Sequence, residues 1–177
     1  MKIRTKVEGE ILNYYNAINF LKEHQPLPDD ELLDEETVSK YEEVRRYFLN
    51  NPSPECIPLF LNSFGMGSGF GVYQLIEDVL LKCSEEQVLR HLIDALESRN
   101  IGVIYWSVQI ASYYPNDDLV LPLSVLLNNQ NADIRYHAVV ALSEINSAIA
   151  QKMLRDRQHI ETDQEIIELI NNINESD

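Results

Sequence analysis

The chain has 177 residues, of which 45% are hydrophobic, and its low glycine and proline content favours helices over sheets. This length allows one domain, or one short array of repeats, with a substantial buried core. Twenty-nine Asp and Glu residues against fourteen Lys and Arg residues give a formal net charge of −15. Such a surface repels nucleic acid and anionic lipid and attracts a basic protein over long range, although an acidic surface also serves simply to keep a protein soluble.

The positions of the Lys and Arg residues further limit the possible partners. No Lys or Arg occurs from Phe48 to Leu81, or from Asn100 to Ile134. A nucleic-acid-binding protein needs clustered cations to neutralise phosphates, so we exclude that class. The first ten residues mix both charges, and no apolar run approaches the roughly 18 residues of a membrane helix. We therefore expect a cytoplasmic protein with neither a nucleic-acid nor a membrane partner.

Two helices are predicted in the first 50 residues. Hydrophobic residues recur at helical spacing over residues 8–24 and again over residues 35–50. Pro26 and Pro28 interrupt the pattern, and the acidic run at 29–36 is interpreted as a solvated loop that leads into a negatively charged first turn. We treat residues 1–50 as an atypical N-terminal helical cap.

The remainder of the chain is also predicted to be helical, with no strand. Candidate capping boxes begin at Ser84, paired with Gln87, and at Thr162, paired with Glu165. The predicted helices span residues 56–64, 72–83, 85–98, 101–114, 117–128, 132–146 and 148–158, with a final helix that ends at 173.

A repeat of 31 residues connects four of these helices. Shifting the chain by this length places Leu92 on Leu123, and further matches follow along both helices: Leu96 on Leu127, Asn100 on Asn131, Val103 on Ile134, Tyr105 on Tyr136 and Val108 on Val139. A helical pair repeated in tandem is typical of solenoids, whose units bury their apolar faces against each other.

Residues 119–145 resemble a HEAT-type repeat. The resemblance is carried by Pro122 inside the first helix, by the turn at 131–133, and by Ile134 and Arg135 followed by small side chains at Ala138 and Ala141. Residues 88–114 are a poorer copy, so the best match covers 88–146. The resemblance implies an all-α, antiparallel helix-turn-helix solenoid in one domain, with HEAT-like repeats over 55–146 and C-terminal capping helices over 147–177. It further implies that the second helix of each repeat lines an inner surface, and that the protein is a binding scaffold rather than an enzyme.

The glycine-rich segment at 65–71, GMGSGFG, has two interpretations. A phosphate loop needs a preceding strand and a third glycine or a lysine, but Phe70 occupies the glycine position and no lysine follows before Lys82. Backbone amides at the start of the next helix remain able to hold an anion. We favour a long turn between helices in which Met66 and Phe70 contact a partner.

The helical register and the acidic turns predict an acidic, aromatic-containing inner surface on the second helices. If Val103, Ser107, Ile110 and Ala111 pack inward, as their counterparts Ile134, Ala138, Ala141 and Leu142 do, other side chains must face outward. The alternative is that the large aromatic rings cover the core, where such rings are usually found. The predicted partner-binding residues are Trp106, Gln109, Tyr113, Tyr105, Tyr136, His137, Met66 and Phe70.

No catalytic, metal-binding or cofactor-binding constellation is predicted. The four histidines lie far apart in sequence, and Cys56 and Cys83 are interpreted as free core cysteines. We expect a non-catalytic protein-binding module, for example an immunity- or antitoxin-like inhibitor of a basic toxin. The alternative is a structural adaptor or self-associating subunit of a larger complex.

Overall fold

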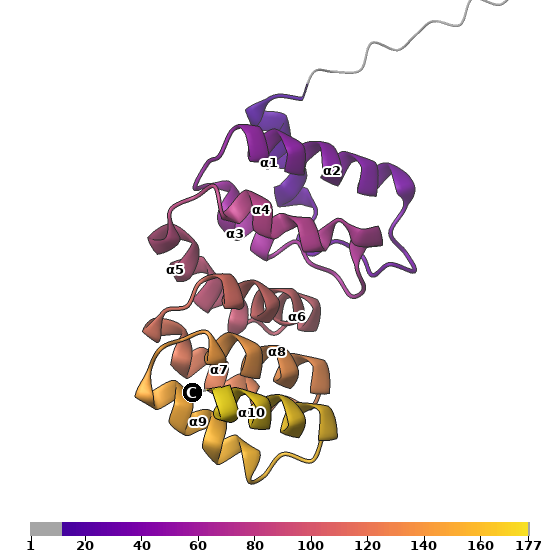
Figure 1. Cartoon of the computed structure of the whole chain (residues 1–177). Helices are drawn as coiled ribbons and strands as arrows, with labels where there is room; N and C mark the ends of the chain where they lie inside the picture. Colours follow the sequence, from indigo (N-terminus) through magenta and orange to yellow (C-terminus); the bar gives the residue numbers. More distant parts are fainter. Residues whose placement is uncertain (1–11, 177) are drawn as a thin grey trace, which may run out of the picture.

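The computed structural model describes residues 12–176, and within that range the regular elements are helices, with no strand. The predicted all-α class is confirmed. The α-helices follow one another from one end of the molecule to the other (Figure 1): α1 (Tyr14–Glu23), α2 (Glu35–Asn50), α3 (Cys56–Leu61), α4 (Ile76–Leu80), α5 (Glu85–Leu96), α6 (Ile101–Ile110), α7 (Val120–Leu126), α8 (Ala132–Ser143), α9 (Ala148–Gln158) and α10 (Gln164–Ser176).

The first two helices begin at side-chain caps. Asn13 accepts a hydrogen bond from the amide of Asn16 at 3.0 Å, and Asp34 accepts one from the amide of Thr37 at 2.8 Å. Each cap satisfies a backbone amide that has no partner inside the helix. Residues 8–11 of the predicted first helix lie outside the described residues, whereas the predicted helix at 35–50 is confirmed.

The helices pack in two layers. Odd-numbered helices contact one another in sequence, α1 with α3, α3 with α5, α5 with α7 and α7 with α9. Even-numbered helices do the same, α2 with α4, α6 with α8 and α8 with α10. Helices of the two layers also contact each other, α1 with α2, α5 with α6, α7 with α8 and α9 with α10 (Figure 1).

The 31-residue repeat corresponds to equivalent positions in this packing. Asn100 caps α6 and Asn131 caps α8, each through its side-chain oxygen. All residues predicted to pack inward on these two helices, and on the 3-10 turn that continues α6 from Ala111, are buried. This confirms that part of the register: Val103, Ser107, Ile110, Ala111, Ile134, Ala138, Ala141 and Leu142.

Both predicted capping boxes are wrong. The Ser84 hydroxyl bonds to Oε1 of Gln87 at 2.8 Å and caps no backbone amide. At the last helix, Asp163 takes the capping position and accepts hydrogen bonds from the amides of Glu165 and Ile166. Thr162 does not take it because the helix begins one residue later, after a turn organised by a buried carboxylate.

That buried carboxylate is Glu161, which ties the last pair of helices to α8. Its side chain is fully buried and pairs with Arg135 of α8 at 3.1 Å and with Arg157 of α9 at 2.5 Å. The amides of Thr162 and Asp163 also donate to it, at 2.8 and 3.0 Å. Burial alone would raise the pKa of this carboxyl, but the bonds from Arg135, the two amides and Arg157 outweigh it and lower the pKa to about 2.

Candidate protein-binding surface

The glycine-rich segment is held by two carboxylates from the acidic run. Asp30 accepts hydrogen bonds from the amides of Ser68 and Gly69, both at 2.8 Å, and Asp29 accepts one from the amide of Met66 at 2.9 Å. The backbone of Gly67 has φ 103°, and a Cβ there would lie 2.3 Å from Cγ of Asp30. Only glycine therefore lets this loop close around the carboxylate.

Most of the acidic run is exposed, as predicted for a solvated loop, and Glu35 and Glu36 form the acidic first turn of α2. The contact with the glycine-rich segment and the burial of one residue were not predicted. Asp29 and Asp30 are bound to the glycine-rich segment, and Leu33 is buried in the core. The same contact argues against an external anion at this loop, because the amides of Ser68 and Gly69 already donate to the carboxylate of Asp30. The remaining carboxylates of the run, such as Glu31 and Glu35, are exposed.

Trp106 connects this loop to α6. Its indole Nε1–H donates to the carbonyl oxygen of Gly67 at 3.0 Å. The ring stacks on Phe64 at a centroid distance of 5.9 Å and meets Tyr73 edge to face at 5.7 Å. Trp106 is therefore half-buried: one side of the ring rests on the core, and its edge orders the loop.

A row of aromatic contacts continues from Trp106 to the next even-numbered helix. Tyr105 lies against Trp106 and against His137, with centroid distances of 5.5 and 6.2 Å, and His137 lies against Tyr136 at 5.5 Å. All four rings are partly exposed. The 31-residue repeat produces this row because Tyr105 and Tyr136 occupy equivalent positions on α6 and α8.

Three hollows open along these rings. The first has a volume of about 390 Å³ and lies between α6 and the segment that contains Tyr73 and Glu77. The second, about 330 Å³, is enclosed by the glycine-rich loop and the amino ends of α6 and α8. The third, about 280 Å³, lies between the amino ends of α8 and α10. These volumes lie near the lower end of the range of small-molecule pockets, about 300–1,000 Å³, so each hollow has room for a side chain of a partner.

We call the surface formed by the three hollows the aromatic groove. Trp106 lines both the first and the second hollow, and Asp133 lines both the second and the third. The hollows are thus neighbours that share walls. Among the described residues that line them there is no Lys or Arg, while the acidic residues are Glu77, Asp133, Asp163 and Glu165.

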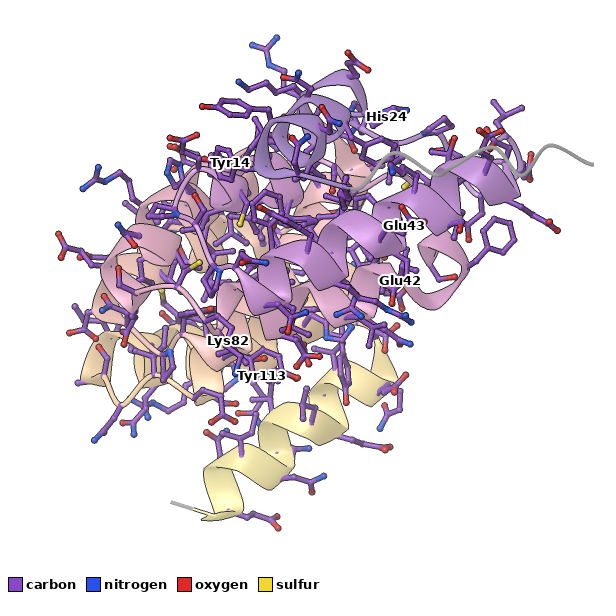
Figure 2. The ribbon with its side chains drawn as sticks, turned by 90° about the horizontal axis from the view of Figure 1, so that it is seen from above. Tyr14, His24, Glu42, Glu43, Lys82 and Tyr113 are labelled. Carbon is purple, nitrogen blue, oxygen red and sulfur yellow. The ribbon has the colours of Figure 1, made fainter. Side chains whose placement is uncertain are left out.

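The titratable groups of the aromatic groove keep it free of positive charge at neutral pH. Burial lowers the pKa of His137 despite the opposing charge of Asp133, so its imidazole is neutral. The pKa of Tyr113 is raised, first by its hydrogen bond to Glu77 and then by desolvation. Figure 2 shows Tyr113 on the side of the molecule where α10 lies.

Seven of the eight predicted partner-binding residues line this groove. The first hollow is lined by Trp106, Gln109 and Tyr113, the second also by Met66 and Tyr105, and the third by Tyr136 and His137. Tyr113 is 49% exposed and Met66 42% exposed. Phe70 is 62% exposed but lines none of the three hollows.

The sequence predicted an acidic surface, but the predicted partner-binding residues included no individual carboxylate and omitted Tyr73. Tyr73 lies in the middle of a cation-free stretch, and Asp133 and Glu165 start helices, where their acidity is explained by the helix dipole alone. Proximity along the groove depends on contacts between helices that no local pattern shows. The signal available beforehand was the shared absence of cations from 48–81 and 100–134, the two segments that meet at the first two hollows.

Cys56 and Cys83 are both free cysteines. Burial raises the pKa of Cys56 to about 12 and also raises the pKa of Cys83, so both thiols are protonated at neutral pH. Across residues 12–176, no three His, Cys, Asp or Glu side chains gather in a way that could hold a metal ion. In the same range, no helix is both long and apolar enough to cross a membrane.

No family model matches the chain, and comparison with curated proteins and with solved structures finds no significant match.

Proposed function

We propose that this chain is a HEAT-like α-solenoid that binds a basic protein through the aromatic groove and catalyses no reaction. The observation that carries the proposal is the composition of the groove: partly exposed rings alternate with carboxylates, and the described lining residues include no Lys or Arg.

The two-layer packing supports the solenoid. Residues related by the 31-residue repeat share their roles, since Asn100 and Asn131 both cap a second helix, and Leu92 and Leu123 are both fully buried. Arg135, part of the HEAT-like motif, donates to the carbonyl oxygens of Asn129 and Gln130 in the turn between α7 and α8, and so stabilises the turn of its own repeat.

The exposure of the rings supports protein binding. Binding energy at protein interfaces concentrates in a few Trp, Tyr and Arg side chains that bury apolar area at little entropic cost. Trp106, already fixed by Phe64 and Gly67, is preorganised for such a contact. The net charge of −15 would speed the encounter with a basic partner. An immunity- or antitoxin-like inhibitor of a basic toxin is the concrete version that fits this size and charge.

A capture experiment with matched variants tests the proposal. The full chain is immobilised, exposed to extract of its native cells, and bound proteins are identified by mass spectrometry. We expect a basic partner whose capture falls at least tenfold in the double variant Asp133→Asn/Glu165→Gln, which removes carboxylates from the first turns of α8 and α10. The control is Glu85→Gln/Glu86→Gln, which removes two from the first turn of α5, outside the groove.

The salt dependence gives an independent readout. Because exposed charges are screened over roughly 10 Å at 0.1 M salt, binding driven by charge should weaken steeply as salt is added. Equal capture by both double variants, or capture that is indifferent to salt, would contradict the proposal.

The second candidate, an adaptor or self-associating subunit, is favoured by a different surface. Leu121 and Val125 lie one turn apart on α7 and are 70% and 66% exposed. Sedimentation velocity of the wild type and of Leu121→Ser/Val125→Ser tests it: a concentration-dependent dimer that the variant abolishes would favour this candidate.

A further inference from the structure

Each hollow of the aromatic groove places a carboxylate beside an aromatic ring. In the first hollow, Glu77 lies with Trp106 and Tyr113. In the second, Asp133 lies with Tyr105 and Trp106. The third combines Tyr136 with three carboxylates, those of Asp133, Asp163 and Glu165.

This combination suits a guanidinium group. Arginine stacks its planar head on aromatic faces and at the same time donates paired hydrogen bonds to a carboxylate, whereas the lysine ammonium is a compact, strongly hydrated charge. The hollows are open and of side-chain size, so a partner can insert one head group into each without entering the core.

The spacing of the hollows limits how the partner presents these groups. The second and third hollows lie on either side of the amino end of α8, and packed helices are about 8–10 Å apart. An extended chain in the polyproline II conformation advances about 3.1 Å per residue and makes one turn every three residues. Every third side chain therefore lies on the same face, and three residues span about 9 Å. A helical partner segment would need a different period, because it rises only about 1.5 Å per residue.

We propose that the aromatic groove binds an extended segment of the partner, in the polyproline II conformation, that carries arginine at every third position, with one guanidinium in each hollow. This inference rests on the protein-binding function proposed above and specifies the chemistry of the partner. The shared walls at Trp106 and Asp133 mean that neighbouring arginines contact a common ring or a common carboxylate, so their spacing matters as well as their number.

Three synthetic peptides of equal length and charge test this proposal. The first carries three arginines at every third position in a Gly-Ser background, the second carries the same three arginines in succession, and the third replaces the spaced arginines by lysines. Trp106 is the sole tryptophan of the chain, so its fluorescence reports binding in the first two hollows directly.

We expect the spaced arginine peptide to bind at least tenfold more tightly than the clustered peptide and at least threefold more tightly than the lysine peptide. Asp133→Asn should remove most of the preference for spacing, and Glu165→Gln should weaken the spaced arginine peptide more than the clustered one. Glu86→Gln, the control in the first turn of α5, should leave all three affinities unchanged.

The outcomes separate this inference from the function on which it rests. Equal affinity for the spaced and clustered arginine peptides would mean that only the net charge attracts them, and would overturn the inference. If that result is found while the captured partner still depends on Asp133 and Glu165, the binding function stands and only the extended arginine segment is wrong. If neither peptide nor partner depends on these residues, both proposals fall.

Discussion

At the scale of single residues, Trp106 both faces the groove and supports the core, so one substitution there would change partner affinity and stability together. Its exposed edge faces the groove, while its ring packs on Phe64 and Tyr73 and its Nε1–H holds Gly67. Trp106→Ala would therefore lower both affinity and stability. Tyr113, which is half exposed and lies in the same hollow, is the cleaner position for measuring a contribution to binding.

Asp30 gives the first prediction at this scale. Asp30→Ala removes the acceptor of two loop amides, those of Ser68 and Gly69, and should lower the free energy of unfolding by about 1–3 kcal/mol. The loop should also lose order, because no other described side chain is bonded to these two amides. Hydrogen exchange of residues 66–71 and Trp106 fluorescence measure that order, and thermal denaturation measures stability.

The neighbouring exposed carboxylate provides the control for this prediction. Glu31→Ala removes the same charge from the adjacent position, outside the hydrogen bonds to the loop, and should change stability by less than about 0.5 kcal/mol. If both variants unfold alike and exchange alike, Asp30 does not organise the glycine-rich segment.

At the scale of elements, Gly102 fixes how closely the loop approaches α6. A glycine in the first turn of a helix is normally improved by alanine, by about 1 kcal/mol. Here a Cβ would lie 2.4 Å from the carbonyl oxygen of Gly65 and 2.6 Å from its carbon, and both atoms belong to backbone. Gly102→Ala should therefore lower the free energy of unfolding by about 2 kcal/mol or more, in spite of the helix propensity.

The 31-residue repeat supplies a matched control for that experiment. Asp133 is the equivalent position of α8 and is exposed, so Asp133→Ala should change stability by no more than about 1 kcal/mol. Chemical denaturation of both variants measures the difference. A Gly102→Ala protein as stable as the wild type would show that the loop does not rest on α6.

Local patterns predicted the elements well and the groove only in part. Helical spacing identified α2 and α5 to α9 because one face of each helix is buried, and the repeat identified the inward positions such as Ser107 and Ala138. The contacts that shape the groove join residues far apart in sequence, 39 positions apart for Trp106 and Gly67 and for Asp30 and Gly69. No local period encodes such contacts. The cap at Ser84 is absent because its hydroxyl bonds to the Gln87 side chain, and the cap at Thr162 is absent because the helix begins one residue later, with Asp163 at the capping position.

At the scale of the whole molecule, charge is distributed unevenly between the groove and the C-terminal pair of helices. The groove gathers carboxylates without described Lys or Arg partners in its lining, whereas the last pair is attached through Arg135 and Arg157, which share the buried Glu161. A buried ion pair adds little stability over an apolar substitute, but removing one member leaves the other charges unpaired. The attachment of α9 and α10 should thus be the part of the fold most sensitive to pH.

The pH dependence of Glu161 gives the last prediction. Its pKa is lowered from 4.5 to about 2 in the folded protein, so the stabilisation is complete above pH 4.5 and is lost as the pH falls from 4.5 towards 2. The lowering corresponds to about 3 kcal/mol. Glu161→Gln should be less stable than the wild type by about 3 kcal/mol at pH 7, and the two stabilities should converge near pH 2. Denaturation at several pH values measures the difference, which isolates Glu161 because the other acidic groups titrate in both proteins.

The control for this prediction is the exposed Glu144. Glu144→Gln should follow the wild-type curve throughout. A gap between wild type and Glu161→Gln that stays constant from pH 7 to pH 2 would mean that the charge of Glu161 does not fasten the last helices to α8.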